Sequence, residues 1–109
     1  MTSNVWAWNL HLDCLFDGVT MRLNFDNTSN IGFVTREEWR DGACVSKPCT
    51  KEGSFQRSDN FYFFKFDSPT ERMEVNRKDL AYKHEFPNLP STNYGTCKVV
   101  VRETKKNKI

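Results

Sequence analysis

The sequence lacks several features that would indicate particular classes of protein. It has no uninterrupted run of about 20 apolar residues, so no membrane span is expected. Its five glycines are scattered singly, which argues against a glycine-rich phosphate-binding loop. The formal net charge is only +2, too small by itself to indicate a polyanionic partner. No internal repeat or low-complexity segment occurs, and 109 residues suit one small domain.

The N-terminal region also lacks the pattern of a secretory signal. Residues 1–14 alternate between apolar and polar side chains, without a basic start or a continuous apolar core. We therefore expect that, if the protein is secreted, its signal peptide has already been removed.

Large apolar side chains recur at every second position in several segments, which is the period of a β-strand. The clearest segments are residues 6–16, 19–25, 60–68, 79–86 and 94–104. Residues 36–42 are compatible with a helical turn or a loop, and residues 42–54 resemble a loop. About seven short strands predict an all-β sandwich or barrel, with a domain at 1–104 and a frayed basic tail at 105–109.

The four cysteines, Cys14, Cys44, Cys49 and Cys97, allow three disulfide pairings. Cys14 and Cys97 lie on the inward-facing side of the first and last predicted strands, and Cys44 and Cys49 share one loop. This placement favours Cys14–Cys97 with Cys44–Cys49. A zinc site and reduced cysteines remain as alternatives, although structural zinc sites usually contain two closely spaced ligand pairs.

A second motif fits an oxidising, extracellular environment. Asn27-Thr28-Ser29 matches the N-glycosylation acceptor pattern and falls in a polar loop. Such triplets also occur by chance, so the motif adds only modest weight to the cysteine argument. Together they favour a secreted, disulfide-bonded domain.

No combination of residues indicates an active site, a metal site or a cofactor. His11 has outward strand parity, and His84 shares parity with Tyr82, as a satisfied semi-buried histidine would. The acidic pair at 37–38 adjoins Arg36 and Arg40 and is explained as a solvated surface. We therefore expect a protein without enzymatic activity.

The segment NFYFFKF at 60–66 is rich in aromatic side chains, which in some RNA-binding sheets stack on bases. It lacks the glycine and the basic residues of such motifs, so nucleic-acid binding is not favoured. One face of this strand should fill the core. The other exposes Phe61 and Phe63, which either a loop of the same domain or a partner would cover.

Three tryptophans are further candidates for contact residues. Trp6 and Trp8 share the core parity but lie near the chain end. Trp39 is flanked by Glu38, Arg40 and Asp41, and Arg36 begins the same segment. Tryptophan and arginine are common interface anchors. Residues 36–42 are therefore the best candidate for a contact loop, against the alternative that Trp39 packs on its own domain.

The order of these features resembles the N-terminal module of zona pellucida proteins, the ZP-N domain. The resemblance is carried by LHLDCLFDGVTMRLNF at 10–25, NIGFVTREEWRDGAC at 30–44, DLAYKHEF at 79–86 and YGTCKVVV at 94–101. It implies an Ig-like antiparallel sandwich in which Tyr82 takes the position of the family's tyrosine. It also implies pairing of the first cysteine with the fourth and the second with the third, the same pairing that strand parity favours.

These features lead to a functional hypothesis. The resemblance implies an extracellular recognition module of an egg coat or similar matrix, which assembles into filaments or binds a partner, such as a gamete protein. Exposed strand edges would then pair with another module. Two alternatives remain: a secreted inhibitor or effector that binds through the Cys44–Cys49 loop, and an intracellular nucleic-acid-binding domain.

Overall fold

A computed structural model of the chain describes residues 9–67, 70–89 and 91–100. Trp6, Trp8 and the tail at 105–109 lie outside the described residues. The described part contains nine strands. They are β1 (Leu10–Phe16), β2 (Val19–Phe25), β3 (Ile31–Arg40), β4 (Ala43–Cys44), β5 (Lys51–Arg57), β6 (Phe61–Phe66), β7 (Glu71–Asn76), β8 (Ala81–Phe86) and β9 (Ser91–Val99). No helix of this part is long and apolar enough to span a membrane.

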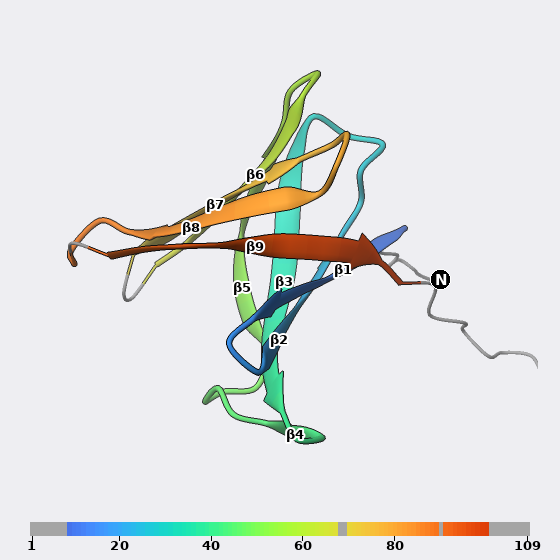
Figure 1. The fold of residues 1–109 in the computed structure, drawn as a ribbon. Helices are drawn as coiled ribbons and strands as arrows, with labels where there is room; N and C mark the ends of the chain where they lie inside the picture. Colours follow the sequence, from blue (N-terminus) through green and yellow to red (C-terminus); the bar gives the residue numbers. More distant parts are fainter. Residues whose placement is uncertain (1–8, 68–69, 90, 101–109) are drawn as a thin grey trace, which may run out of the picture.

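Eight of the strands form a closed antiparallel barrel (Figure 1). Each barrel strand pairs with the barrel strand that follows it, so that β3 pairs with β5, and β1 pairs with β9 to close the sheet. The short β4 pairs only with the end of β3, where the loop that follows it extends beyond the barrel. The prediction of an all-β antiparallel fold is thus confirmed. Of the two architectures that the strand pattern allowed, the sheet forms an eight-strand barrel rather than a clear sandwich.

The sandwich and the barrel differ in how strands pair, not in how residues alternate. A sandwich separates its strands into two sheets, whereas here β2 pairs with β3 as well as β1, so the sheet is continuous. Closure also removes free edges from the eight barrel strands. The expected docking through exposed strand edges is therefore unsupported for these strands.

Two Asp-Gly pairs set the hairpin turns at one end of the barrel. Asp17 and Gly18 have φ angles of 50° and 82°, and Asp41 and Gly42 have 54° and 80°. Consecutive positive φ angles are typical of the two-residue turns that match the twist of a hairpin. Because the second pair makes the turn from β3 to β4, residues 36–40 belong to a strand rather than to a helical turn or contact loop.

The barrel interior is filled by side chains from alternate positions of every strand, as expected for eight strands. Towards the end away from β4, an aromatic cluster contains Phe25, Phe55, Tyr62 and Phe64. The ring centroid of Phe25 lies 4.7 Å from that of Phe55 and 5.0 Å from that of Phe64. Neighbouring apolar side chains complete the core, so this half of the barrel has no room for a large ligand.

Both predicted disulfides are present, and no described cysteine is free. Cys14 and Cys97 are opposite each other in the β1–β9 pair and are buried in the interior. In a chain-entropy description, closing a loop of this length stabilises the fold by about 4–5 kcal/mol. Cys44–Cys49 closes the loop that follows β4. With all four cysteines in disulfides, the zinc alternative has no thiolate ligands.

Gly95 on β9 permits a close contact that ties β8 to β1. A Cβ atom at this position would lie 2.6 Å from the backbone oxygen of Leu15 and 2.7 Å from the Tyr82 ring. The absence of a side chain lets the Tyr82 ring cross β9, and its hydroxyl donates a hydrogen bond to the same Leu15 oxygen at 3.1 Å.

Gly95→Ala should therefore lower the free energy of unfolding by about 1–3 kcal/mol, because neither the backbone oxygen nor the buried ring has space to move. Gly32→Ala is the matched control, since a Cβ there meets no atom within 4 Å. Urea unfolding of both variants measures the difference. Equal stability of the two variants would contradict the packing described for Tyr82.

Candidate functional site

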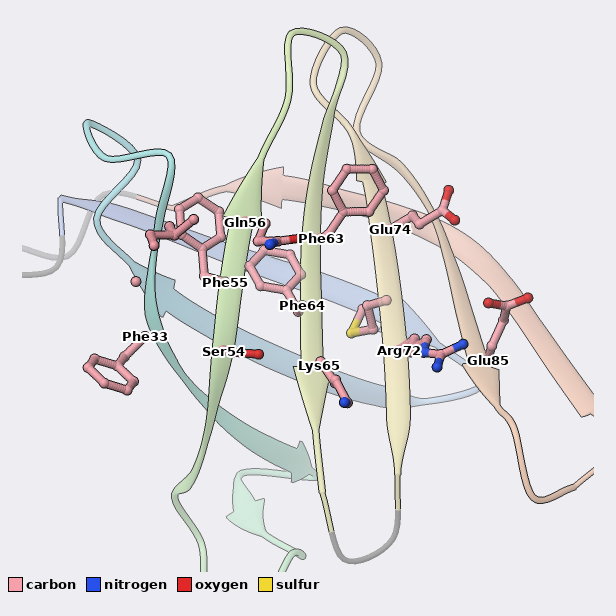
Figure 2. A pocket seen from close by; sticks show the side chains of 13 residues that line it. Phe33, Ser54, Phe55, Gln56, Phe63, Phe64, Lys65, Arg72, Glu74 and Glu85 are labelled. Atoms are coloured by element: carbon pink, nitrogen blue, oxygen red, sulfur yellow. The ribbon is translucent and has the colours of Figure 1, made fainter.

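An extensive apolar hollow lies on the outer surface of the barrel, across β3, β5, β6 and β7. We call it the outer groove; its volume is about 710 Å³. It is lined by Ile31, Gly32, Phe33, Ser54, Phe55, Gln56, Phe63, Phe64, Lys65, Arg72, Met73, Glu74 and Glu85. Figure 2 shows the labelled side chains on four neighbouring strands and on β8.

The register of the strands explains the shape of the groove. Phe33 lies opposite Ser54, Ser54 opposite Lys65, and Lys65 opposite Arg72, so these outward side chains form one row (Figure 2). Ser54 is small and stands between two much larger neighbours. The row is therefore low in the middle, which leaves the hollow over β5.

Three apolar side chains give the groove its hydrophobic half. Ile31 is 67% exposed and Phe33 is 73% exposed, which is unusual for side chains of this size placed close together. Phe63 lines the same groove and its ring packs against that of Phe61, with the centroids 5.8 Å apart. The predicted outward orientation of Phe61 and Phe63 is confirmed, and both side chains are half-buried.

The other half of the groove carries charges of both signs. The ammonium of Lys83 lies 4.0 Å from the Glu74 carboxylate and 3.6 Å from the Glu85 carboxylate. Lys65 and Arg72 form no ion pair with any residue in 9–67, 70–89 or 91–100. The groove thus has two positive charges without an ion-pair partner among these residues. Next to them lie two carboxylates that share the ammonium of Lys83.

The predicted contact residues on β3 are not gathered in one site. Arg36 is only 4% exposed and points into the barrel, so its proposed role in partner contact is wrong. Sequence reasoning missed this because the charged run at 36–40 suggested a surface. The inward position follows from the strand alternation that places Val34 in the core.

Trp39 and Arg40 lie at the end of β3 far from Phe33. The indole nitrogen of Trp39 donates a hydrogen bond to Glu37 Oε1 at 2.8 Å, and the guanidinium of Arg22 lies 4.8 Å from its ring centroid. Trp39 is thus half-buried against its own domain, as the alternative interpretation held. Arg40 is exposed, and neither residue contributes to the outer groove.

Asn27 lies in the turn between β2 and β3, as expected for a glycosylation site in a loop. Its amide nitrogen donates a hydrogen bond to the Tyr62 hydroxyl at 3.3 Å, which orients the side chain. The glycosylation itself stays a prediction.

A second polar feature is a cluster of charged side chains inside the barrel, towards the end that carries β4. Arg36 Nη1 donates a hydrogen bond to Glu71 Oε1, and His84 Nε2 donates to the same oxygen at 2.9 Å. The Lys51 ammonium lies 3.5 Å from the other Glu71 oxygen. His84 is thus a buried histidine with a hydrogen-bond partner, as its parity with Tyr82 predicted. His11, on the outer face, instead bonds to Asn24 at 2.6 Å.

The environment of Glu71 keeps its carboxylate ionised. Burial alone raises the pKa of this group, but the hydrogen bonds from His84 and Arg36 and the positive charge of Arg36 outweigh it. The net result lowers the pKa of Glu71 from the ordinary value of 4.5 to about 2. This buried carboxylate therefore acts as the common acceptor that fixes β3, β5, β7 and β8 at this end of the barrel.

The cluster lies beside a small cavity of about 110 Å³, which is lined by Cys14, Phe16, Val19, Met21, Glu38, Tyr82, His84, Phe86 and Asn93. The share of liquid volume that one water occupies is about 30 Å³, so this space suits a few waters rather than a typical cofactor. Among the described residues, no group of three or more His, Cys, Asp or Glu side chains is placed to hold a metal ion.

Comparison of the chain with protein-family models, curated proteins and solved structures finds no match. The inner cluster pairs the charges of Arg36 and Glu71 within the fold, whereas the outer groove exposes apolar and charged groups that a partner can use.

The inner cluster makes stability depend on pH in the acid range. Because the pKa of Glu71 is lower in the folded state than in the unfolded chain, its contribution is complete above about pH 4.5. It should be lost as the pH falls from about 4.5 towards 2, by on the order of 2 kcal/mol. Urea unfolding of the protein across this range measures the loss.

The variant Glu71→Gln should be less stable at neutral pH, because Arg36 loses its buried anion, and it should show a smaller fall in stability between these pH values. Glu74→Gln is the control, since Glu74 lies on the outer surface and its replacement should leave the acid dependence unchanged. An identical acid dependence in Glu71→Gln and the unmodified protein would contradict this assignment.

Proposed function

We propose that the protein is an extracellular recognition module that binds another protein through its outer groove. The observation that carries the proposal is the pair of highly exposed side chains, Ile31 and Phe33, beside Phe63 over a preformed hollow. Exposed apolar groups of this kind, bordered by polar residues, are typical of protein interaction sites. Two disulfides are compatible with an extracellular location.

The proposal keeps the recognition role expected from the sequence and leaves out the egg-coat setting. That setting depends on the resemblance to ZP-N domains, which implies a sandwich, whereas this sheet closes into a barrel. The docking mechanism also changes. A groove between outward side chains replaces the free strand edges, since the eight barrel strands are paired on both sides.

A second candidate is a secreted inhibitor or effector that binds through the loop between Cys44 and Cys49. The observation in its favour is the position of this loop beyond the end of the barrel (Figure 1). The disulfide closes the loop, and Val45, Lys47 and Pro48 are exposed on it. The loop contains a single apolar side chain of large size, so it offers less contact area than the outer groove.

Phe33→Ser tests the proposal, because the side chain is mostly exposed and its replacement should change the stability of the fold little. Partner proteins captured from an extracellular extract by the immobilised protein should bind the variant at least about tenfold more weakly. Leu89→Ser is the matched control, since Leu89 is also exposed but lies outside the groove. Affinities of the captured proteins for each variant provide the measurement.

Three results would contradict the proposal. The first is unchanged capture by Phe33→Ser. The second is a loss of capture on replacement of Val45 and Lys47 with serine, which would assign binding to the loop. The third is a dimer in sedimentation that dissociates in Phe33→Ser, which would assign the groove to a second copy of this chain.

A further inference from the structure

The charges of the outer groove specify the chemistry of its partner. We propose that the groove binds an extended peptide segment in which an acidic side chain and an apolar side chain point to the same side. This inference rests on the proposed function, because it takes the groove as the binding site and adds the identity of the groups that it recognises.

The acidic requirement comes from Lys65 and Arg72. These exposed side chains lie directly opposite each other on β6 and β7 and form no ion pair with any described residue. Like charges opposite each other in an antiparallel pair destabilise it. A carboxylate placed between the two cations removes this repulsion and gains hydrogen bonds from both.

The acidic residues of the groove do not meet this requirement. Glu85 lies opposite Arg72 on β8, but its carboxylate is 3.6 Å from the ammonium of Lys83. The same ammonium lies 4.0 Å from Glu74. Lys83 therefore offsets one of the two negative charges and holds both carboxylates, and the two positive charges on β6 and β7 have no ion pair among the described residues and remain for an incoming anion.

The apolar requirement comes from the other end of the same row. Phe33 lies opposite Ser54 in this row, and Ile31 and Phe63 lie on either side of Gln56 in the neighbouring row. All three line the groove, so an aromatic or aliphatic side chain can lie between the Phe33 and Phe63 rings. Figure 2 shows Phe33 on one side of Ser54 and Lys65 on the other. The apolar and cationic halves therefore adjoin within one groove.

An extended peptide fits these two halves because its side chains alternate between faces. Residues two apart in such a peptide point to the same side, about 6–7 Å from each other. A negative charge next to a large apolar group can thus be supplied by a short linear segment. The mixed charge of the groove makes a nucleic acid a poor fit, because its phosphates would also meet Glu74 and Glu85.

The test uses three capped heptapeptides with serine at every odd position. The even positions carry phenylalanine, an acidic or control residue, and leucine, so that all three side chains share one face when the peptide is extended. The central residue is glutamate in the first peptide, glutamine in the second and lysine in the third. Binding to the isotopically labelled protein is followed by amide chemical shifts at low salt.

The glutamate peptide should bind saturably and shift amides of β3, β5, β6 and β7 around the groove. The glutamine peptide should bind more weakly, and the lysine peptide should bind at least about tenfold more weakly than the glutamate peptide. Combined Lys65→Gln and Arg72→Gln should remove the preference for glutamate over glutamine. Lys78→Gln, a change at an exposed lysine outside the groove, should preserve it.

The outcomes separate this inference from the proposed function. Equal affinities of the three peptides at the groove would overturn the acidic requirement and leave the groove as a docking site. Absence of binding by all three peptides would overturn the inference. The proposed function would then still be decided separately, by whether the Phe33→Ser variant loses its capture of partner proteins. Binding of dodecanoate at the groove as tight as that of the glutamate peptide would assign the site to a small amphipathic acid instead.

Discussion

The pairing of β1 with β9 is the constraint on which the rest of the structure depends. It joins the two ends of the described chain and turns a series of hairpins into a closed barrel. Cys14 and Cys97 fix this pairing covalently from inside. Once the sheet is closed, alternate side chains must face a narrow interior, and the eight strands have no free edge for pairing with another chain.

The interior that results serves the stability of the fold rather than the recognition of a large ligand. Aromatic rings fill one half, and the Arg36–Glu71–His84 cluster connects strands in the other half. Buried charges of this kind are tolerated because each has a partner of opposite charge or a hydrogen bond. The groups available to a partner therefore lie on the outer surface, where Phe33, Ile31 and Phe63 are accessible beside the cations of Lys65 and Arg72.

The sequence predicts the local structure well because strand alternation depends on neighbouring residues alone. The inward position of Cys14, the outward position of Phe63 and the turn at Asp17-Gly18 all follow from it, and so does the pairing of the cysteines. Closure of the barrel depends on which distant strands pair. Strand alternation cannot predict it, because the same alternation is compatible with a sandwich. The buried position of Arg36 does not follow from local sequence, because a charged residue is expected at the surface and its buried partner Glu71 lies 35 positions away.

The most direct test of the account is a set of NMR distance restraints between backbone protons of facing strands. The closed barrel predicts cross-strand contacts between Leu12 and Val99 in the β1–β9 pair. It also predicts contacts between Phe25 and Val34 in the β2–β3 pair, within the same molecule. Two separate sheets, with either of these contacts absent while the disulfides are intact, would contradict the barrel and with it the assignment of the groove.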